Sequence, residues 1–400
     1  LRERTKVMLQ THLIAELLDM EAYDFEGLEQ NEKQIVLRVR MKRRAQECPV
    51  CRTPCDQVHD YRIQRVKDSP IQGKTVIWQY RKRRYRCPCC GKRFYESNYL
   101  LPRRHRITNR LAALGIDQLR KKQSRKEIAS TLGVSESSVG RWMNLLEFGK
   151  PALLPKVLSI DEFRGNTEYG KFQCILTDPV HKRVLDVLPT RYHAQIYDYL
   201  RAFPNRNQVQ YFVMDMNREY MDIAKKLLPN AKIVIDRFHV VRYCTWALEN
   251  VRKRVQAKLL PEQRKYFKRS RKLLLAHMRD LSTENKAVVE RMLLMSCDLR
   301  EAYLLKEKIY NFMDSSDSSQ AKERLRVFRA HAFVADLPEF ASCLTMLKNW
   351  EPYILNAFDC PYSNGFTEGV NNKIKVLKRI AFGYRSFRNF RIRILCTTHA

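Results

Sequence analysis

The fold is decided by the stretch Val157-Leu-Ser-Ile-Asp-Glu-Phe163. The stretch is short and mostly apolar, a pattern that predicts a buried strand. Asp161, near its end, has no charge partner within the run. Because a buried carboxylate is costly unless it is paired or bound to a metal, Asp161 is a candidate site residue. The plainer interpretation is an aspartate just beyond the strand end that caps a turn.

Apolar segments after this stretch predict the rest of a sheet. Two of them follow after short turns, which predicts an antiparallel meander. A helix, a strand ending in Asp215, a second helix and a strand ending in Asp236 come next. Three strands, a helix, a strand, a helix and a strand match the order of the ribonuclease H fold, an α/β architecture with a mixed five-stranded sheet. The segments are, in order, 157–163, 172–177, 183–188, 192–203, 209–215, 218–228 and 232–236.

The charge of the chain favours a polyanionic partner. Its 400 residues include 75 Lys and Arg against 43 Asp and Glu, a formal net charge of +32 at pH 7. Nucleic acid is the first candidate. An anionic membrane surface is the competitor, but no apolar run approaches the roughly 20 residues of a spanning helix and no signal peptide precedes the fold. We therefore expect a cytoplasmic globular protein of two or three domains.

Half of the twelve cysteines lie between Cys48 and Cys90. Cys48-Pro-Val-Cys51 and Cys87-Pro-Cys-Cys90 are paired-thiol motifs whose spacing predicts one structural Zn²⁺ held by Cys48, Cys51, Cys87 and Cys90. Cys89 could replace Cys90 as the fourth ligand, and Cys55 and His59 lie nearby in sequence. The alternative is a set of reduced core thiols.

A strand at Thr75–Tyr80 predicts a ribbon between the two motifs, and a basic run follows it. This run is predicted to contact DNA phosphates, and a solvated charged face is the alternative. Its members are Arg81, Lys82, Arg83 and Arg84.

Residues 109–146 predict a helix-turn-helix. Ser124 can cap a helix with Glu127 in a capping box, Gly133 makes the turn, and Ser135 caps the second helix. On that helix Val139 and Trp142 would pack inward. The outward residues Ser137, Arg141 and Asn144 could enter a major groove and read base edges. An ordinary helical hairpin is the alternative.

The remaining segments predict mostly helix. Residues 5–20 form an amphipathic pattern, residues 35–40 alternate like a strand, and residues 240–358 show long helical periodicity that we interpret as an all-α insertion. The stretch Ser363–Lys375 opens a helix that carries Glu368 in its first turns. Basic residues downstream are expected to hold a DNA strand by its phosphates: Lys373, Lys375, Lys378 and Arg379.

Three acids could form one catalytic centre. Cleavage of a phosphodiester by two metal ions needs converging carboxylates, which Asp161, Asp215 and Glu368 can supply for two Mg²⁺ or Mn²⁺ ions. Asp236 is the rival for the second position or a neighbour of the site, and His239 could orient phosphate or water. Glu162 alternates to the opposite face of the strand and is not expected to be a ligand. We expect Asp178 and Asp186, near predicted turns, at the surface.

The order of these motifs resembles the ISL3 family of bacterial insertion-sequence transposases. The resemblance covers nearly the whole chain and is carried by the two cysteine motifs, the helix-turn-helix, Ser159-Ile-Asp-Glu-Phe163, Met214-Asp-Met216, Asp236-Arg-Phe-His239, Ser363–Lys375 and Gly383-Tyr-Arg385. It implies a DDE transposase with Asp161, Asp215 and Glu368 as its triad, a ribonuclease H-like catalytic domain with an α-helical insertion, and a zinc module and helix-turn-helix that bind the terminal inverted repeats. The run Cys87-Pro-Cys-Cys90 departs from a simple paired-thiol pattern.

The resemblance extends these expectations to partners and domains. Substrates would be the element's ends and target DNA, held by at least a homodimer in the bacterial nucleoid. A zinc and helix-turn-helix regulator, or a nuclease of the same fold that cuts without joining, are the alternatives. The expected division is an N-terminal helix and strand (1–44), a zinc ribbon (45–107), the helix-turn-helix (108–150), the first part of the catalytic core (151–240), the helical insertion (241–360) and the C-terminal core helices (361–400).

Overall fold

Alternating apolar residues build a sheet at the N-terminal end of the chain. The computed structural model describes residues 18, 20–267 and 270–398, so most of the helix predicted at 5–20 lies outside the described residues. The sheet order is β1-β2-β6-β5, with β7 paired to β6, and β2 runs parallel to β6. Trp78 and Tyr80 on β6 are fully buried in its core. The strands are β1 (Tyr23–Gln30), β2 (Gln34–Met41), β5 (Val58–Ile71), β6 (Lys74–Arg86) and β7 (Arg93–Tyr95).

This sheet includes the strands predicted at 35–40 and 75–80. The boundary suggested between residues 44 and 45 falls between β2 and β6, which are neighbours in one sheet. A small two-stranded ribbon, β3 (Gln46–Glu47) and β4 (Pro54–Cys55), stands beside it and carries the first cysteine motif in its turn.

Three short helices follow the N-terminal sheet: α2 (Asn109–Gln118), α3 (Arg125–Leu132) and α4 (Glu136–Asn144). The local signals act as predicted. Ser124 and Glu127 form a capping box, Gly133 has a left-handed φ of 61°, and the Ser135 side chain caps α4. Val139 and Trp142 are buried in the core of this three-helix unit.

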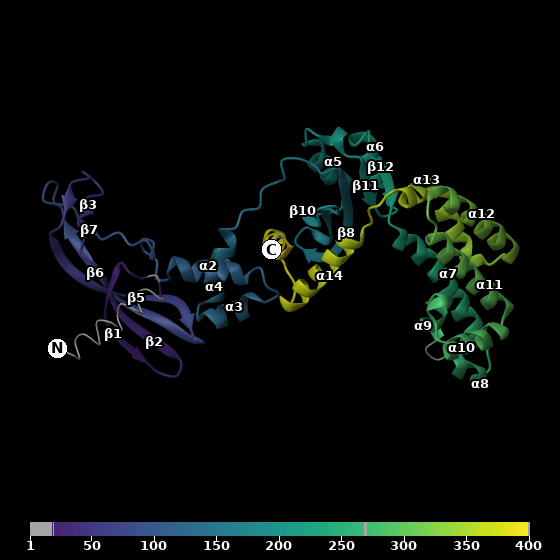
Figure 1. Ribbon diagram of the computed structural model, residues 1–400, viewed down its shortest axis with the longest axis horizontal. Coiled ribbons are helices and arrows are strands. Elements are labelled where there is room, and N and C mark those ends of the chain that lie inside the picture. The colour runs from purple at the N-terminus through teal and green to yellow at the C-terminus, as the bar shows by residue number, and fades with distance from the viewer. Residues whose placement is uncertain (1–17, 19, 268–269, 399–400) are drawn as a thin grey trace.

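The central sheet has the strand order β10-β9-β8-β11-β12. β8 pairs antiparallel with β9 and parallel with β11, so the sheet is mixed, as predicted. The meander and the two strand–helix repeats are all present, and helices α5 and α6 pack beside one another (Figure 1). The elements are β8 (Val157–Thr167), β9 (Gly170–Asp178), β10 (Arg183–Leu188), α5 (His193–Arg201), β11 (Tyr211–Met214), α6 (Arg218–Leu227) and β12 (Lys232–Ile235).

Among the described residues between β12 and α14, every regular element is helical. The long helix α7 leads from the central sheet into this body, and α11 packs along it (Figure 1). The periodicity predicted over residues 240–358 comes from several helices: α10, for example, ends at Leu294, and the Ser296 side chain caps the next helix. The α-helices are α7 (Arg237–Lys258), α8 (Pro261–Arg264), α9 (Ser270–Leu275), α10 (Thr283–Leu294), α11 (Cys297–Met313), α12 (Ser318–Ala335) and α13 (Ala341–Asp359). None of the described helices is long and apolar enough to cross a membrane.

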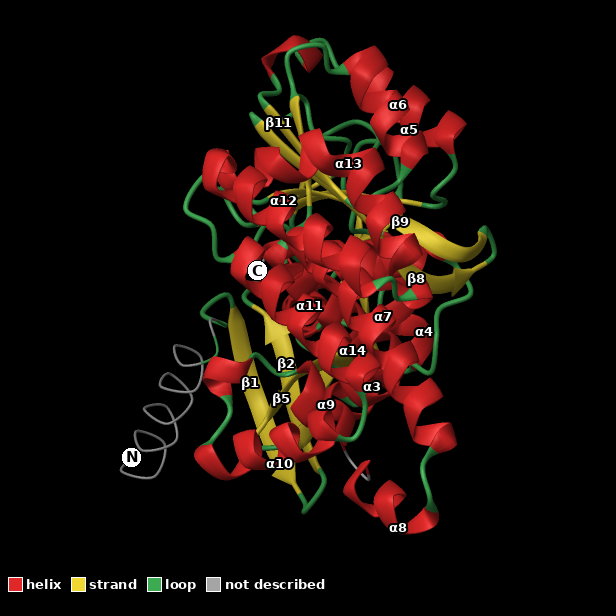
Figure 2. Cartoon of the chain, turned by 90° about the vertical axis from the view of Figure 1, so that its right-hand side faces the viewer, coloured by secondary structure: helices red, strands yellow, loops and turns green. Residues whose placement is uncertain are grey.

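Two C-terminal helices, α14 (Gly365–Ile380) and α15 (Phe387–Thr398), return to the central sheet. In Figure 1, α15 lies beside β10, between this sheet and the three-helix unit. Ile392 and Cys396 of α15 complete the core around α2–α4, whereas Phe390 and Ile394 pack with residues of the central sheet. One helix therefore belongs to two cores. Figure 2 looks along the molecule from the helical body, with the N-terminal sheet behind it.

The prediction that Asp178 and Asp186 lie at the surface was wrong. Both residues are buried. Asp178 accepts hydrogen bonds from two backbone amides of its turn and lies 3.2 Å from Arg183. Asp186 lies 2.6 Å from Arg391 of α15 and accepts a hydrogen bond from a tyrosine hydroxyl. Cations from other parts of the fold make their burial possible.

Candidate active site

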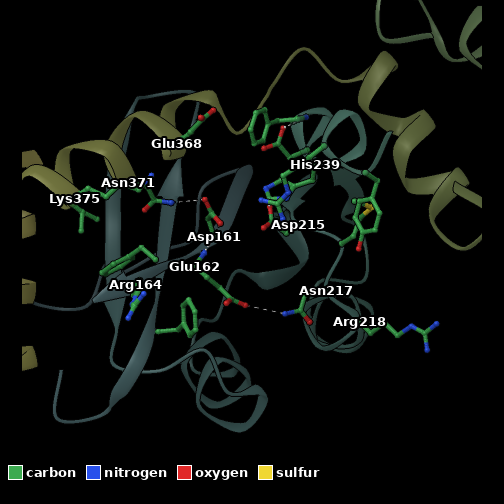
Figure 3. A pocket seen from close by; sticks show the side chains of 18 of the residues that line it. Asp161, Glu162, Arg164, Asp215, Asn217, Arg218, His239, Glu368, Asn371 and Lys375 are labelled. Atoms are coloured by element: carbon green, nitrogen blue, oxygen red, sulfur yellow. Dashed lines mark hydrogen bonds and ion pairs between the residues drawn. The ribbon is translucent and has the colours of Figure 1, made fainter. Parts of the chain in front are cut away.

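The register of the central sheet brings three aspartates to the same level. β11 pairs with β8 through Tyr211↔Val157 to Val213↔Ser159, and with β12 through Tyr211↔Lys232 to Met214↔Ile235. Asp215 follows the last paired residue of β11. If both pairings are extended to it, Asp215 lies beside Asp161 on the β8 side and beside Asp236 on the β12 side. They line one end of a cleft of about 930 Å³ (Figure 3).

Asp161 is held by two hydrogen bonds of 2.7 Å. Its carboxylate accepts one from the backbone amide of Glu162 and one from the side chain of Asn371 on α14. Burial and the nearby charge of Asp215 raise its pKa to about 7. The carboxyl is therefore poised to lose its proton near neutrality, and a cation would favour the charged form.

Asp215 and His239 form a pair with 2.9 Å between Oδ1 and Nε2. Burial lowers the pKa of His239, but its hydrogen bond with Asp215 and that charge outweigh burial, so the net shift is upward. Asp236 caps α7 by accepting a hydrogen bond from the Phe238 amide, and its pKa is raised, chiefly by burial. One ligand atom from each of Asp215, Asp236 and His239 lies within 4.8 Å of the others.

Glu368 enters the same cleft from the first turn of α14 (Figure 3). Buried hydroxyl contacts fix that turn against the sheet: Ser159 of β8 donates to Asn364, and the Thr177 and Thr367 hydroxyls lie 2.7 Å apart. The charge of Glu368 contributes to the raised pKa of Asp236. Glu368 therefore lines the cleft from a separate element, outside the group of ligand atoms formed by Asp215, Asp236 and His239.

The donor set fits hard divalent cations. Asp161, Asp215 and Glu368 offer carboxylate oxygens, which Mg²⁺ and Mn²⁺ prefer, and His239 offers a nitrogen beside them. Burial, and after it the charges of neighbouring carboxylates, raise the pKa values of Asp161 and Asp236. A divalent cation would supply compensating positive charge.

Glu162 also lines the cleft, but its carboxylate is engaged by other partners. Its carboxylate accepts hydrogen bonds from Arg191 at 2.7 Å and from Tyr220 at 2.9 Å. In Figure 3 it is turned away from Asp161 toward Asn217. Its charge is satisfied by these partners.

The four predicted zinc ligands gather in one cluster. The sulfur atoms of Cys48, Cys51, Cys87 and Cys90 all lie within 4.8 Å of one another, and three of the pairs are separated by 3.4–3.5 Å. A tetrahedron with Zn–S bonds of about 2.3 Å has edges of about 3.8 Å, so the cluster fits this ion. Cys89 is exposed and lies outside the cluster.

The predicted DNA contacts divide into exposed and buried groups. Most are exposed: Arg81, Ser137, Arg141, Asn144, Lys373, Lys375 and Arg379. Lys378 is partly buried and donates to the backbone of Arg164 in the cleft wall. Lys82 is also partly buried and lies over the ring of Tyr95.

The prediction for Arg83 was wrong. Arg83 is 4% exposed and forms a buried ion pair of 3.2 Å with Glu96. Its neighbour Arg84 lies 2.5 Å from Asp60. The basic run on β6 is thus partly neutralised within the sheet.

Comparison with known proteins places this site in a family. A family model described as transposase, of the ISL3 type, matches residues 158–394. The chain belongs to the ISL3 transposase family. Two further family models match N-terminal parts of this ISL3 transposase. The zinc finger of transposases IS204/IS1001/IS1096/IS1165 matches residues 44–90, and the helix-turn-helix domain of the ISL3 family matches residues 98–146.

Individual relatives agree with this assignment. The transposase for insertion sequence element IS1001 of Bordetella parapertussis is 25% identical over 97% of the ISL3 chain and 98% of its own length. The transposase for IS1557 of Mycobacterium tuberculosis is 25% identical over 65% of the chain and 61% of its own. A Lactococcus lactis protein named ATP-dependent protease is 35% identical, over 34% of the chain and 40% of its own. The chain is thus similar to insertion-sequence transposases along almost all of its length.

The sequence did not single out Asn371 as a functional residue. It follows Glu368 by three positions, so the two residues share a face of α14. In the ISL3 transposase this face brings the Asn371 amide to Asp161. Helical spacing was the signal that could have found it.

Proposed function

We propose that this transposase is a DDE enzyme that cuts DNA at the ends of its element and joins them to target DNA. The observation that carries the proposal is the convergence of Asp161, Asp215 and Glu368 on one cleft from three separate elements. The strand order β10-β9-β8-β11-β12 supports a ribonuclease H-like core, with the helices between β12 and α14 as an insertion. The division predicted from the sequence is proposed for the domains, with residues 23–41 sharing the sheet of the zinc-binding part.

The three acids would hold two Mg²⁺ or Mn²⁺ ions, which would activate the attacking hydroxyl and neutralise charge on the phosphate. His239 orients the Asp215 carboxylate and can exchange a proton with it. Asn371 fixes one oxygen of Asp161. Asp236 uses one carboxylate oxygen to cap α7 and lies within the group of ligand atoms around His239, so we propose Asp215 as the metal ligand and Asp236 as its neighbour in the site.

DNA recognition falls to the exposed residues of the helix-turn-helix. Ser137, Arg141 and Asn144 would read base edges of the terminal inverted repeats. Exposed cations on α14, among them Lys373 and Lys375, would position the strand by its phosphates. At least two copies of the chain would act together, because two element ends must be held at once.

The test compares cleavage with binding in the full-length protein. Asp161→Asn and Glu368→Gln should each lower Mg²⁺-dependent cleavage of a labelled element end by more than about 100-fold, since even partners of metal ligands contribute 10–100-fold. End binding should be unchanged in both variants. Asp198→Asn, an exposed acid on α5, is the matched control and should cleave normally.

The products decide between functions. Joined element and target DNA support the transposase mechanism, whereas cut ends that never join would indicate a nuclease. The triad assignment would be wrong if Glu368→Gln cleaved as well as the wild type with equal binding.

A further inference from the structure

A row of aromatic and basic side chains runs along α7 away from the active-site cleft. Phe238, Arg242 and Trp246 are spaced four residues apart, so they share one face of the helix. Phe238 and Arg242 line the cleft, and the Arg242 guanidinium lies 4.7 Å from the Trp246 ring. The helix begins at the capping residue Asp236, so this row is fixed to the catalytic end of the sheet.

Trp246 differs from the other tryptophans of the chain. It is 50% exposed, while Trp78, Trp142 and Trp350 are 7% exposed or less. Phe238 is 52% exposed. The two large exposed rings flank an arginine whose Nε, within the part of the chain that the structure describes, is buried without a hydrogen-bond partner, and they mark this face beside a charged cleft as a candidate ligand surface.

The row continues into a second hollow of about 470 Å³ lined by Trp246, Glu249, Asn250, Lys253 and Arg271. Its one acid is neutralised, because Glu249 lies 2.7 Å from Arg252 and 3.9 Å from Arg271. The buried Nε of Arg242 has no hydrogen-bond partner among the described residues. With Arg242 on the cleft side of Trp246 and Lys253 and Arg271 in the hollow, this face is suited to a ligand that combines a flat ring with negative charge.

We propose that the Arg242–Trp246 face of α7 binds an unpaired nucleotide of the DNA strand that leaves the active site. This inference rests on the proposed function, because DNA cleavage in the cleft is what would place a strand beside this face of α7. The indole ring would stack on the base, and Arg242 and Lys253 would contact its phosphates. A base within a duplex has both faces covered by its neighbours, so the ring selects a base that has left the stack.

The spacing agrees with this position. Eight residues separate Phe238 from Trp246, which is about 12 Å along a helix axis at 1.5 Å per residue. That is the span of about two nucleotides of an extended strand. The bound base would thus lie within a few nucleotides of the phosphate in the cleft.

The first experiment uses Trp246 as its own reporter in the full-length protein. A DNA duplex with a four-nucleotide single-stranded overhang should quench the exposed tryptophan fluorescence, and the same duplex with blunt ends should not. Trp246→Phe should abolish the quenching, because the reporting indole is gone. The variant should still bind the overhang, because a phenyl ring can stack on a base. Quenching that persists in Trp246→Phe, or equal quenching by the blunt duplex, would overturn the proposal.

The second experiment measures affinity. Trp246→Ala should weaken binding of the overhang duplex by roughly 5- to 100-fold, the usual effect of losing one base-stacking ring, and leave blunt-duplex binding unchanged. Phe333→Ala removes a ring that is 84% exposed on α12 and is the matched control. An equal loss in Phe333→Ala, or no change in Trp246→Ala, contradicts the inference.

Two further outcomes separate this inference from its alternatives. Asp161→Asn should show the same quenching as the wild type, since stacking needs neither the metal nor cleavage; if wild-type cleavage fails but quenching remains, only the catalytic proposal falls. If Trp246→Ala changes the sedimentation of the DNA-free protein, the α7 face is a protein contact and the nucleotide site is wrong.

Discussion

At the scale of single residues, the proposed active site is a place where like charges are brought together. Asp161 and Asp236 both have raised pKa values because burial and neighbouring carboxylates disfavour their charged forms. The only close positive partner of Asp215 among the described residues is His239. Such crowding makes sense in a site built to receive cations, and it leaves the metal-free protein strained by its own charges.

This strain predicts a pH-dependent effect of Asp161→Asn on stability. The pKa of Asp161 is 3.8 in its ordinary state and about 7 in the fold. Between these values the folded protein holds a proton that the unfolded chain has lost, so stability falls as pH rises through this window. Asp161→Asn removes the effect, and the variant should melt a few degrees above the wild type at pH 8.

The measurement is Tm at pH 5 and pH 8 without added divalent cations and without a chelator, which would attack the cysteine cluster. The difference should be roughly 40% as large at pH 5 as at pH 8, because at pH 5 only the part of the window between 3.8 and 5 has been crossed. Asp198→Asn serves as the exposed control and should show no such dependence. A difference of equal size at both pH values would contradict the electrostatic origin.

Sequence patterns predicted the acids of this site, but they did not predict which charged residues elsewhere in the chain the fold buries in ion pairs. Asp161, Asp215 and Glu368 could be predicted because apolar runs revealed the strands and the helix that carry them. The burial of Arg83 could not, since its partner Glu96 reaches it only through pairing of β6 with β7. A basic run shows charge density but not which of its members the fold neutralises.

At the scale of elements, the cysteine cluster shows a binding site made by two turns. Cys51 lies in the turn between β3 and β4, and hydrogen bonds with Thr53 lower its pKa to about 6. A thiolate available at neutral pH is the form that binds zinc. The ribbon buries few apolar residues of its own, so the ion would contribute much of its stability.

Cys51→Ser should therefore remove the bound metal. Elemental analysis of the purified protein should give about one zinc per chain for the wild type and well below one for the variant. Cys89→Ser is the matched control, because Cys89 is an exposed thiol of the second cysteine motif, between β6 and β7, that lies outside the cluster. Zinc loss in Cys89→Ser with retention in Cys51→Ser would reverse the assignment of ligands.

The helix-turn-helix shows which parts of an element the sequence predicts well. Ser124, Gly133 and Ser135 gave correct helix ends because capping is local chemistry. The contact between α2 and α4 is different: a Cβ added at Gly115 would lie 2.3 Å from the Trp142 ring. That close approach depends on the packing angle of two helices, which no local pattern specifies.

At the scale of the whole molecule, α15 joins the DNA-binding helices to the catalytic sheet. Arg393, 2% exposed, donates to the carbonyls of Leu119, Lys121 and Gln123 after α2. On the other side, Arg391 lies 2.6 Å from Asp186 of β10. This connection sets the position of the helix-turn-helix relative to the cleft. The sequence predicted a helix-turn-helix and a catalytic core as separate domains and did not predict that α15 connects them.

Arg393→Ala should loosen that connection. The substitution leaves three carbonyls without their donor and should cost about 3 kcal/mol or more of stability. Limited proteolysis should cut the linker between α4 and β8 faster, and cleavage of element ends should become less uniform in position. Arg393→Lys should partly restore both, whereas Arg388→Ala, an exposed neighbour with one long contact, should have little effect. Wild-type resistance to protease in Arg393→Ala would show that α15 does not hold the linker in place.

The membership of α15 in two cores also bears on how the chain folds during synthesis. Every other described element leaves the ribosome before α15, yet both the helix-turn-helix and the catalytic sheet keep an apolar surface open until α15 arrives. A nascent chain that stalls before this helix exposes two apolar surfaces at once, so chaperones and proteases can bind it. Only a chain translated through α15 can close both, so the capacity to engage DNA and the capacity to cut it mature together.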